Sequence, residues 1–170
     1  MLETDNKNIP VSIENDITNH LNNERKELAL DFVGFLRTND MPIALNIFWH
    51  QKNKGHFWFA NYKETEAVCF ILVDGDTEKP GSWEIFTGEN DKSAPECNTT
   101  DEKLKEIVWK HINFCGKCCT NCSPGTSKTI LGKEFRNVCG SAMNFHNPDA
   151  ETLGYIKKLM NLITDTIDKV

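Results

Sequence analysis

The chain has no long apolar run. Hydrophobic residues make up 39% of its 170 residues, but no uninterrupted apolar stretch reaches the roughly 18 residues that a membrane-spanning helix needs. The N-terminus is polar and acidic, and it lacks the basic start and the apolar stretch of a secretory signal. We therefore expect a cytoplasmic protein with no membrane partner.

Clusters of basic residues are also scarce. The chain has 19 lysines and arginines against 25 acidic residues, a formal net charge of -6. The stretch 51–54 contains only two lysines, which is typical of a solvated turn. Proteins that bind nucleic acids usually present a basic face or stripe. No nucleic-acid partner is predicted.

Internal repeats and low-complexity tracts are absent as well. The composition is typical of a globular protein, and the length suffices for one domain with a substantial core. Residues 1–14, rich in Asn, Asp and Glu, are predicted to form a flexible tail. Residues 15–170 are predicted to form a single domain.

Helical spacing of apolar residues marks both ends of this domain. Residues 15–37 carry apolar side chains at helical spacing around a polar gap at 22–25. Thr99 and Glu102 fit a capping box that begins another helix. Asn147 followed by Pro148 fits the start of a C-terminal helix.

Several short runs between the helical segments are typical of β-strands, being rich in aromatic and β-branched residues and bounded by turn residues. They are residues 43–49, 56–62, 67–73, 82–87, 129–131 and 137–145. Short links between the first four predict an antiparallel meander. The third run is apolar on both sides, which predicts a strand buried on both faces. The predicted fold is therefore α+β, an antiparallel sheet flanked by N- and C-terminal helices.

Seven cysteines are many for this length. In a reduced cytosol, such a density points to metal or redox chemistry rather than to disulfides. Four of them fall in a cysteine-rich segment, residues 115–125, which we expect to be a loop: Cys115, Cys118, Cys119 and Cys122. Cys-x-x-Cys spacing lets two thiolates bind one tetrahedral ion, and structural zinc normally takes four ligands. The segment predicts one structural zinc ion.

Two further residues are candidate ligands. Cys139 lies 17 residues after Cys122, at the start of a predicted strand that could return to the segment. His111 stands four residues before Cys115 on the same expected helical face, so that both side chains could reach one ion. Alternatively, His111 packs on the core or donates a hydrogen bond.

Other chemistry remains open for the cysteines. A redox Cys-x-x-Cys pair normally lies at the start of a helix, where the helix dipole favours the thiolate, whereas Cys115 is expected to follow a helix. Four cysteines could hold an iron–sulfur cluster, although the spacing matches neither ferredoxin pattern in full. The cysteines could also lie in a surface loop without a metal or redox role.

Aromatic residues are concentrated in the predicted sheet. Most should belong to the core, because aromatic residues favour strands. A surplus on one face could still line a ligand groove, for which the candidates are Trp58, Tyr62 and Trp83. His50 and His56 flank a polar turn and are more typical of exposed turn residues than of a catalytic or metal pair.

Three segments resemble a known group of proteins. They are Cys-Gly-Lys-Cys at 115–118, Ile-Leu-Gly-Lys-Glu-Phe-Arg-Asn-Val-Cys at 130–139 and Phe-His-Asn-Pro-Asp-Ala-Glu-Thr-Leu at 145–153. They resemble small uncharacterised bacterial proteins, mainly from Firmicutes, in which a cysteine-rich loop precedes a Gly-Lys-Glu-Phe-x-Asn-Val-Cys segment. The resemblance covers about the last third of the chain. It implies that Cys139 belongs with the cysteine-rich segment, and it implies no activity and no catalytic residues.

No nucleophile, base and orienting group can be assembled from spacing, so the sequence leaves enzyme activity undecided. The predicted function is a non-catalytic, zinc-bearing domain that binds a small ligand or a protein partner. The alternative is a thiol-based redox or metal-handling protein that uses the cysteines at 115–122.

Overall fold

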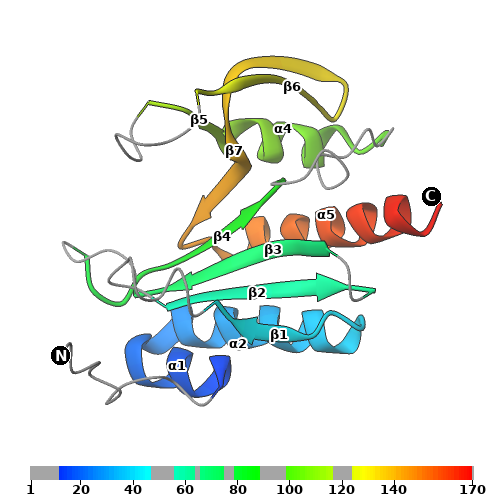
Figure 1. The fold of residues 1–170 in the computed structure, drawn as a ribbon. Helices are drawn as coiled ribbons and strands as arrows, with labels where there is room; N and C mark the ends of the chain where they lie inside the picture. The colour runs from blue at the N-terminus through cyan, green and yellow to red at the C-terminus, as the bar shows by residue number, and fades with distance from the viewer. Residues whose placement is uncertain are drawn as a thin grey trace, which may run out of the picture.

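The computed structural model describes residues 12–46, 56–63, 66–74, 79–88, 99–116 and 124–169. Its elements in chain order are α1 (Ile13–His20), α2 (Asn23–Thr38), β1 (Ile43–Leu45), β2 (His56–Tyr62), β3 (Glu66–Val73), β4 (Trp83–Thr87), α4 (Glu102–Lys110), β5 (Ile112–Phe114), β6 (Thr126–Ile130), β7 (Lys133–His146) and α5 (Ala150–Asp168). The predicted α+β class is confirmed, because an antiparallel sheet is flanked by helices from both ends of the chain (Figure 1). Within these residues, no helix combines the length and the apolar character that crossing a membrane requires.

The sheet starts as the predicted meander and continues into strands from the C-terminal part of the chain. The strand order is β1-β2-β3-β4-β7-β5, and β6 also pairs with β7. β3 is buried on both faces, as its apolar sequence predicts, since Val68 and Cys69 are each 1% exposed. β7 is longer than predicted and joins the meander to an upper arm formed with β5 and β6 (Figure 1).

The helices supply the second layer of the core. In Figure 1 the blue helices α1 and α2 lie beside β1 and β2, and the red helix α5 runs next to β3. Phe32 of α2, Ile71 of β3 and Leu159 of α5 are each completely buried. Ile13 is only 1% exposed, so the folded core begins inside the predicted tail, while residues 1–11 lie outside the described residues.

The single helix expected over residues 15–37 is two helices in the structure. The chain is extended at Leu21 and Asn22, where the polar gap begins, and Asn23 has a φ of 47°. Asn adopts this left-handed conformation at lower cost than most residues. The break lets α1 and α2 pack side by side, which a continuous helix would prevent.

Both predicted helix starts are wrong by two residues. The N-cap of α4 is Asp101 rather than Thr99, and that of α5 is Asp149 rather than Asn147. Each aspartate accepts a hydrogen bond from the backbone N–H three residues further on. Asn147 instead accepts a hydrogen bond from the backbone N–H of Trp83 at 2.9 Å. Asp, Asn and Thr all cap helices well, so only the tertiary contacts select among them.

Candidate functional site

The structure describes part of the predicted zinc site. Cys115 and Cys139 lie among the described residues. Cys118, Cys119 and Cys122 lie outside them. Of the five candidate cysteine ligands, the structure therefore places Cys115 and Cys139.

Strand pairing brings Cys115 near Cys139 although they are far apart in the chain. Phe114 at the end of β5 lies opposite Val138 of β7, and Cys115 and Cys139 are the next residues in opposite directions. The backbone N–H of Cys115 donates to the carbonyl oxygen of Asn137 at 2.8 Å. The regular register ends at Val138, because β7 has four residues between Val138 and Met143 where β5 has one between Ile112 and Phe114. Cys139 therefore begins an irregular stretch of β7 that lies beside the end of β5.

The two ends of the cysteine-rich segment meet at the same place. A Cβ atom built on Gly125 would lie 2.7 Å from Cβ of Cys115 and 2.5 Å from Oδ1 of Asn137, so only glycine fits. Nδ2 of Asn137 donates to the carbonyl oxygen of Cys115 at 2.9 Å. We call Cys115, Gly125 and Asn137 the neck. The neck holds both ends of the cysteine-rich segment beside Cys139.

His111 does not share a helical face with Cys115, so that prediction is wrong. His111 is the C-cap of α4, and the extended strand β5 separates it from Cys115. Nδ1 of His111 is 2.7 Å from the carbonyl oxygen of Ile107, and its ring lies 4.7 Å from the ring of Phe145. His111 therefore packs on the core and forms a hydrogen bond, as the alternative interpretation predicted. The expectation that Cys115 follows a helix is corrected as well, because β5 lies between α4 and Cys115.

Trp58 and Trp83 do not line an open groove. They are 4% and 1% exposed, and the ring of Trp83 lies 6.4 Å from the ring of Phe32 in α2. The opposite face of the same strands carries half-buried phenylalanines: Phe57, Phe59, Phe70 and Phe86. The expectation of a tryptophan groove is thus corrected, because the alternation along a strand separates two faces without showing which face the helices cover.

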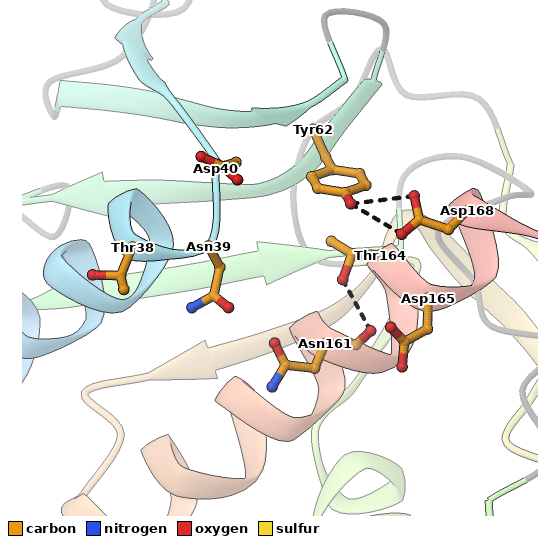
Figure 2. Close-up of a pocket in the computed structure, with 8 residues that line it drawn as sticks. All are labelled: Thr38, Asn39, Asp40, Tyr62, Asn161, Thr164, Asp165 and Asp168. Carbon is orange, nitrogen blue, oxygen red and sulfur yellow. Dashed lines mark hydrogen bonds between the residues drawn. The ribbon is translucent and has the colours of Figure 1, made fainter.

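Tyr62, the third predicted ligand-binding residue, lines a polar pocket of about 480 Å³. Figure 2 shows this pocket between the end of α2, the end of β2 and the last turns of α5. Its lining residues are Thr38, Asn39, Asp40, Tyr62, Asn161, Thr164, Asp165 and Asp168. We call it the acidic pocket. Its volume falls within the range of small-molecule sites.

One acid of the acidic pocket is already paired. The hydroxyl of Tyr62 donates to Oδ2 of Asp168 at 3.1 Å, and Lys63 forms an ion pair with the same carboxylate. The hydrogen bond from Lys63 holds the pKa of Asp168 below its ordinary value. Asp40 and Asp165 add negative charge to the lining. The pocket therefore favours polar ligands that carry positive charge.

A cluster of Asp16, His20 and His56 was not predicted from the sequence. Asp16 of α1 is completely buried, and its Oδ1 atom is 3.0 Å from Nδ1 of His20 and in close contact with Nδ1 of His56. Its Oδ2 atom accepts a hydrogen bond from Nε1 of Trp58 at 2.7 Å. The expectation that His56 is an exposed turn residue is wrong, because its side chain is 14% exposed. The four-residue spacing of Asp16 and His20 was the available signal.

No protein-family model matches this chain, and no curated protein or solved structure matches it significantly. A function for this chain is therefore inferred from its residues and their geometry.

Proposed function

We propose that this chain is a zinc-bearing binding domain in which Cys115 and Cys139 supply two of the thiolate ligands. The remaining ligands come from Cys118, Cys119 and Cys122. The observation that carries the proposal is the neck, which keeps both ends of the cysteine-rich segment beside Cys139. Ligands contributed by a Cys-x-x-Cys turn and by a neighbouring strand are typical of structural zinc sites.

A structural ion would have a clear task at this place. β5 has only three residues, and although Ile112 packs in the core, Phe114 at the end next to Cys115 is 53% exposed, so apolar packing stabilises that end weakly. Zinc binding in small model peptides contributes about 10–16 kcal/mol to folding. Even a fraction of this free energy would hold β5 against β7.

The ligand-binding part of the proposed function belongs to the acidic pocket. Its lining offers hydroxyl, amide and carboxylate groups, and Asp40 and Asp165 leave it negatively charged. These groups bind by hydrogen bonding and charge, which supports a non-catalytic binding role for a small cationic ligand. A simple diamine such as putrescine is a suitable probe. Asp165→Asn should weaken its binding in calorimetry, whereas Glu27→Gln on the exposed surface of α2 should not.

The main experiment measures zinc and thiols on the same sample, purified without added metal or chelator. We expect about one zinc ion per chain bound to thiolates, with three or four thiols protected from alkylation in addition to the buried Cys69. Cys115→Ser and Cys139→Ser should each lower the zinc content and increase the number of reactive thiols. Absence of thiolate-bound zinc from the unmodified chain would reject the proposal.

Cys69→Ala is the matched control. Cys69 is buried in β3, and burial raises the pKa of its thiol to about 12. A thiol that stays protonated is a poor metal ligand, since metals bind the thiolate. Its removal should leave the zinc content unchanged.

The alternative function is a thiol-based redox or metal-handling protein that uses the cysteines at 115–122. It predicts fast alkylation and a reversible disulfide in place of a stable metal. The same thiol count under reducing and oxidising conditions separates the two functions.

A further inference from the structure

We propose a second metal site, formed by Asp16, His20 and His56, for a divalent transition metal such as zinc. One carboxylate oxygen and one ring nitrogen from each histidine lie within 4.8 Å of one another. Two imidazoles and a carboxylate are a donor set used by zinc and by non-haem iron(II), and they leave further coordination positions open. Small side-chain movements would bring all three donors to one ion.

The carboxylate of Asp16 is already oriented for this role. Its Oδ2 atom is held by the indole N–H of Trp58 at 2.7 Å, and its Oδ1 atom faces both histidines. A hydrogen bond that fixes the second oxygen of a ligating carboxylate is common around metal ions. A completely buried carboxylate also needs compensating positive charge, which a divalent ion supplies.

The two histidines come from different elements, and their side chains are partly exposed to solvent. Asp16 and His20 are four residues apart on α1, and His56 is the first residue of β2, so the ion would link the helix to the sheet. The His20 side chain is 34% exposed and that of His56 is 14% exposed. An ion can therefore reach the buried carboxylate from the side of His20.

The ring proton of His20 lies on Nδ1 in this arrangement. Nδ1 of His20 lies 3.0 Å from both the carbonyl oxygen and Oδ1 of Asp16, and because both oxygens are acceptors, this nitrogen donates. A metal ion would take over the contact that Oδ1 of Asp16 now makes with imidazole protons. Metal binding through Nδ1 of His20 would move the ring proton to Nε2, the other ring nitrogen.

The test adds Co²⁺ alone to the metal-depleted full-length chain. Cobalt bound to thiolates has sulfur-to-metal charge-transfer absorption in the near ultraviolet, whereas cobalt bound to nitrogen and oxygen lacks it. We expect one equivalent of bound cobalt without charge-transfer absorption in the wild-type chain. His20→Gln should lose that equivalent and leave the charge-transfer absorption unchanged.

His146→Gln is the matched control, because His146 also faces a carboxylate, that of Glu84 at 3.4 Å, but as a pair rather than as part of a triad. It should keep the full cobalt content. Equal cobalt binding by all three proteins would overturn the proposal and leave a structural hydrogen-bond network. So would a wild-type chain whose bound cobalt is entirely thiolate-ligated. This readout is independent of whether the cysteines bind metal.

A measurement on the unmodified chain keeps the test decisive if His20→Gln does not fold. Zinc added to the ¹⁵N-labelled chain should shift the ring-nitrogen resonances of His20 and His56. The rings of His111 and His146 should stay unchanged. Unshifted resonances of His20 and His56 at saturating zinc would overturn the proposal.

Discussion

Two buried tryptophans differ in what their indole N–H groups contact. Nε1 of Trp58 donates to the carboxylate of Asp16, a charged acceptor, at 2.7 Å. Nε1 of Trp83 is buried and has no hydrogen-bond partner within the described part of the chain. Hydrogen bonds to charged groups contribute about 1.5–3 kcal/mol, and a buried donor without a partner contributes nothing favourable. Replacing each tryptophan in turn therefore isolates the contribution of the Trp58 hydrogen bond to stability.

Trp58→Phe should lower the free energy of unfolding by about 1–3 kcal/mol more than Trp83→Phe. Both changes remove similar ring volume, but only the first leaves Oδ2 of the buried Asp16 carboxylate without its donor. Urea unfolding of both variants at neutral pH measures the difference. Equal losses of stability would contradict the role given to the Trp58 hydrogen bond.

Among the secondary-structure elements, α5 begins at an aspartate whose ionised form is stabilised. The backbone N–H of Thr152 and then its side chain hold the pKa of Asp149 below the ordinary value. A depressed folded-state pKa means that the stabilisation is present above the unfolded-state pKa of about 3.9. It is lost as the pH falls through the lower folded-state pKa.

Asp149→Ala should cost about 1 kcal/mol of stability at pH 7, the usual loss for an N-cap. The wild-type chain and the variant should converge as the pH falls below the folded-state pKa of Asp149, because the carboxylate is then protonated in both states. Urea unfolding over a series of acidic pH values measures this. Glu151→Ala, an exposed first-turn control, should change stability by less than about 0.5 kcal/mol.

The close contacts of the neck require a glycine at position 125. Gly125→Ala should destabilise the chain by about 1–3 kcal/mol, since the new methyl group overlaps Cys115 and Asn137. It should also make thiols of the cysteine-rich segment react faster with an alkylating reagent. Gly140→Ala on β7, where a Cβ meets nothing within 4 Å, is the control and should have little effect. Unchanged thiol reactivity in the first variant would argue against the neck as a constraint.

In the molecule as a whole, the core extends from the helices and the meander into the upper arm. It joins α1, α2 and α5 to the strands of the meander, and it includes Ile112 of β5, Ile130 of β6 and Val138 of β7 in the upper arm (Figure 1). Loss of an ion at the neck would remove a constraint on the arm and leave the apolar contacts of α1, α2 and α5 with the meander in place.

Chelation of the proposed zinc should therefore lower the melting temperature and speed amide exchange in β5 and β6. Amides of β3, such as those of Ile71 and Val73, should stay protected, because both residues are completely buried. Hydrogen exchange with mass spectrometry, with and without chelator, measures both regions. Identical exchange in the arm under both conditions would contradict a metal-held neck.

Local patterns in the amino-acid sequence were sufficient to predict several elements. β2 occupies the predicted residues 56–62, the meander follows from short polar links, and β3 is buried because it is apolar on both sides. The spacing of the cysteines likewise predicts a thiolate site, and that site stays a prediction.

Contacts between distant segments, in contrast, follow only from the packing of the complete fold. Asp16 meets His56 across 40 residues because α1 packs on the face of β2 that also buries Trp58. Strand alternation is local, but the choice of the covered face belongs to the whole core, so the tryptophans were mistaken for a groove. The expectation that His111 shares a helical face with Cys115 was wrong for a related reason, since helical spacing does not mark where a helix gives way to a strand.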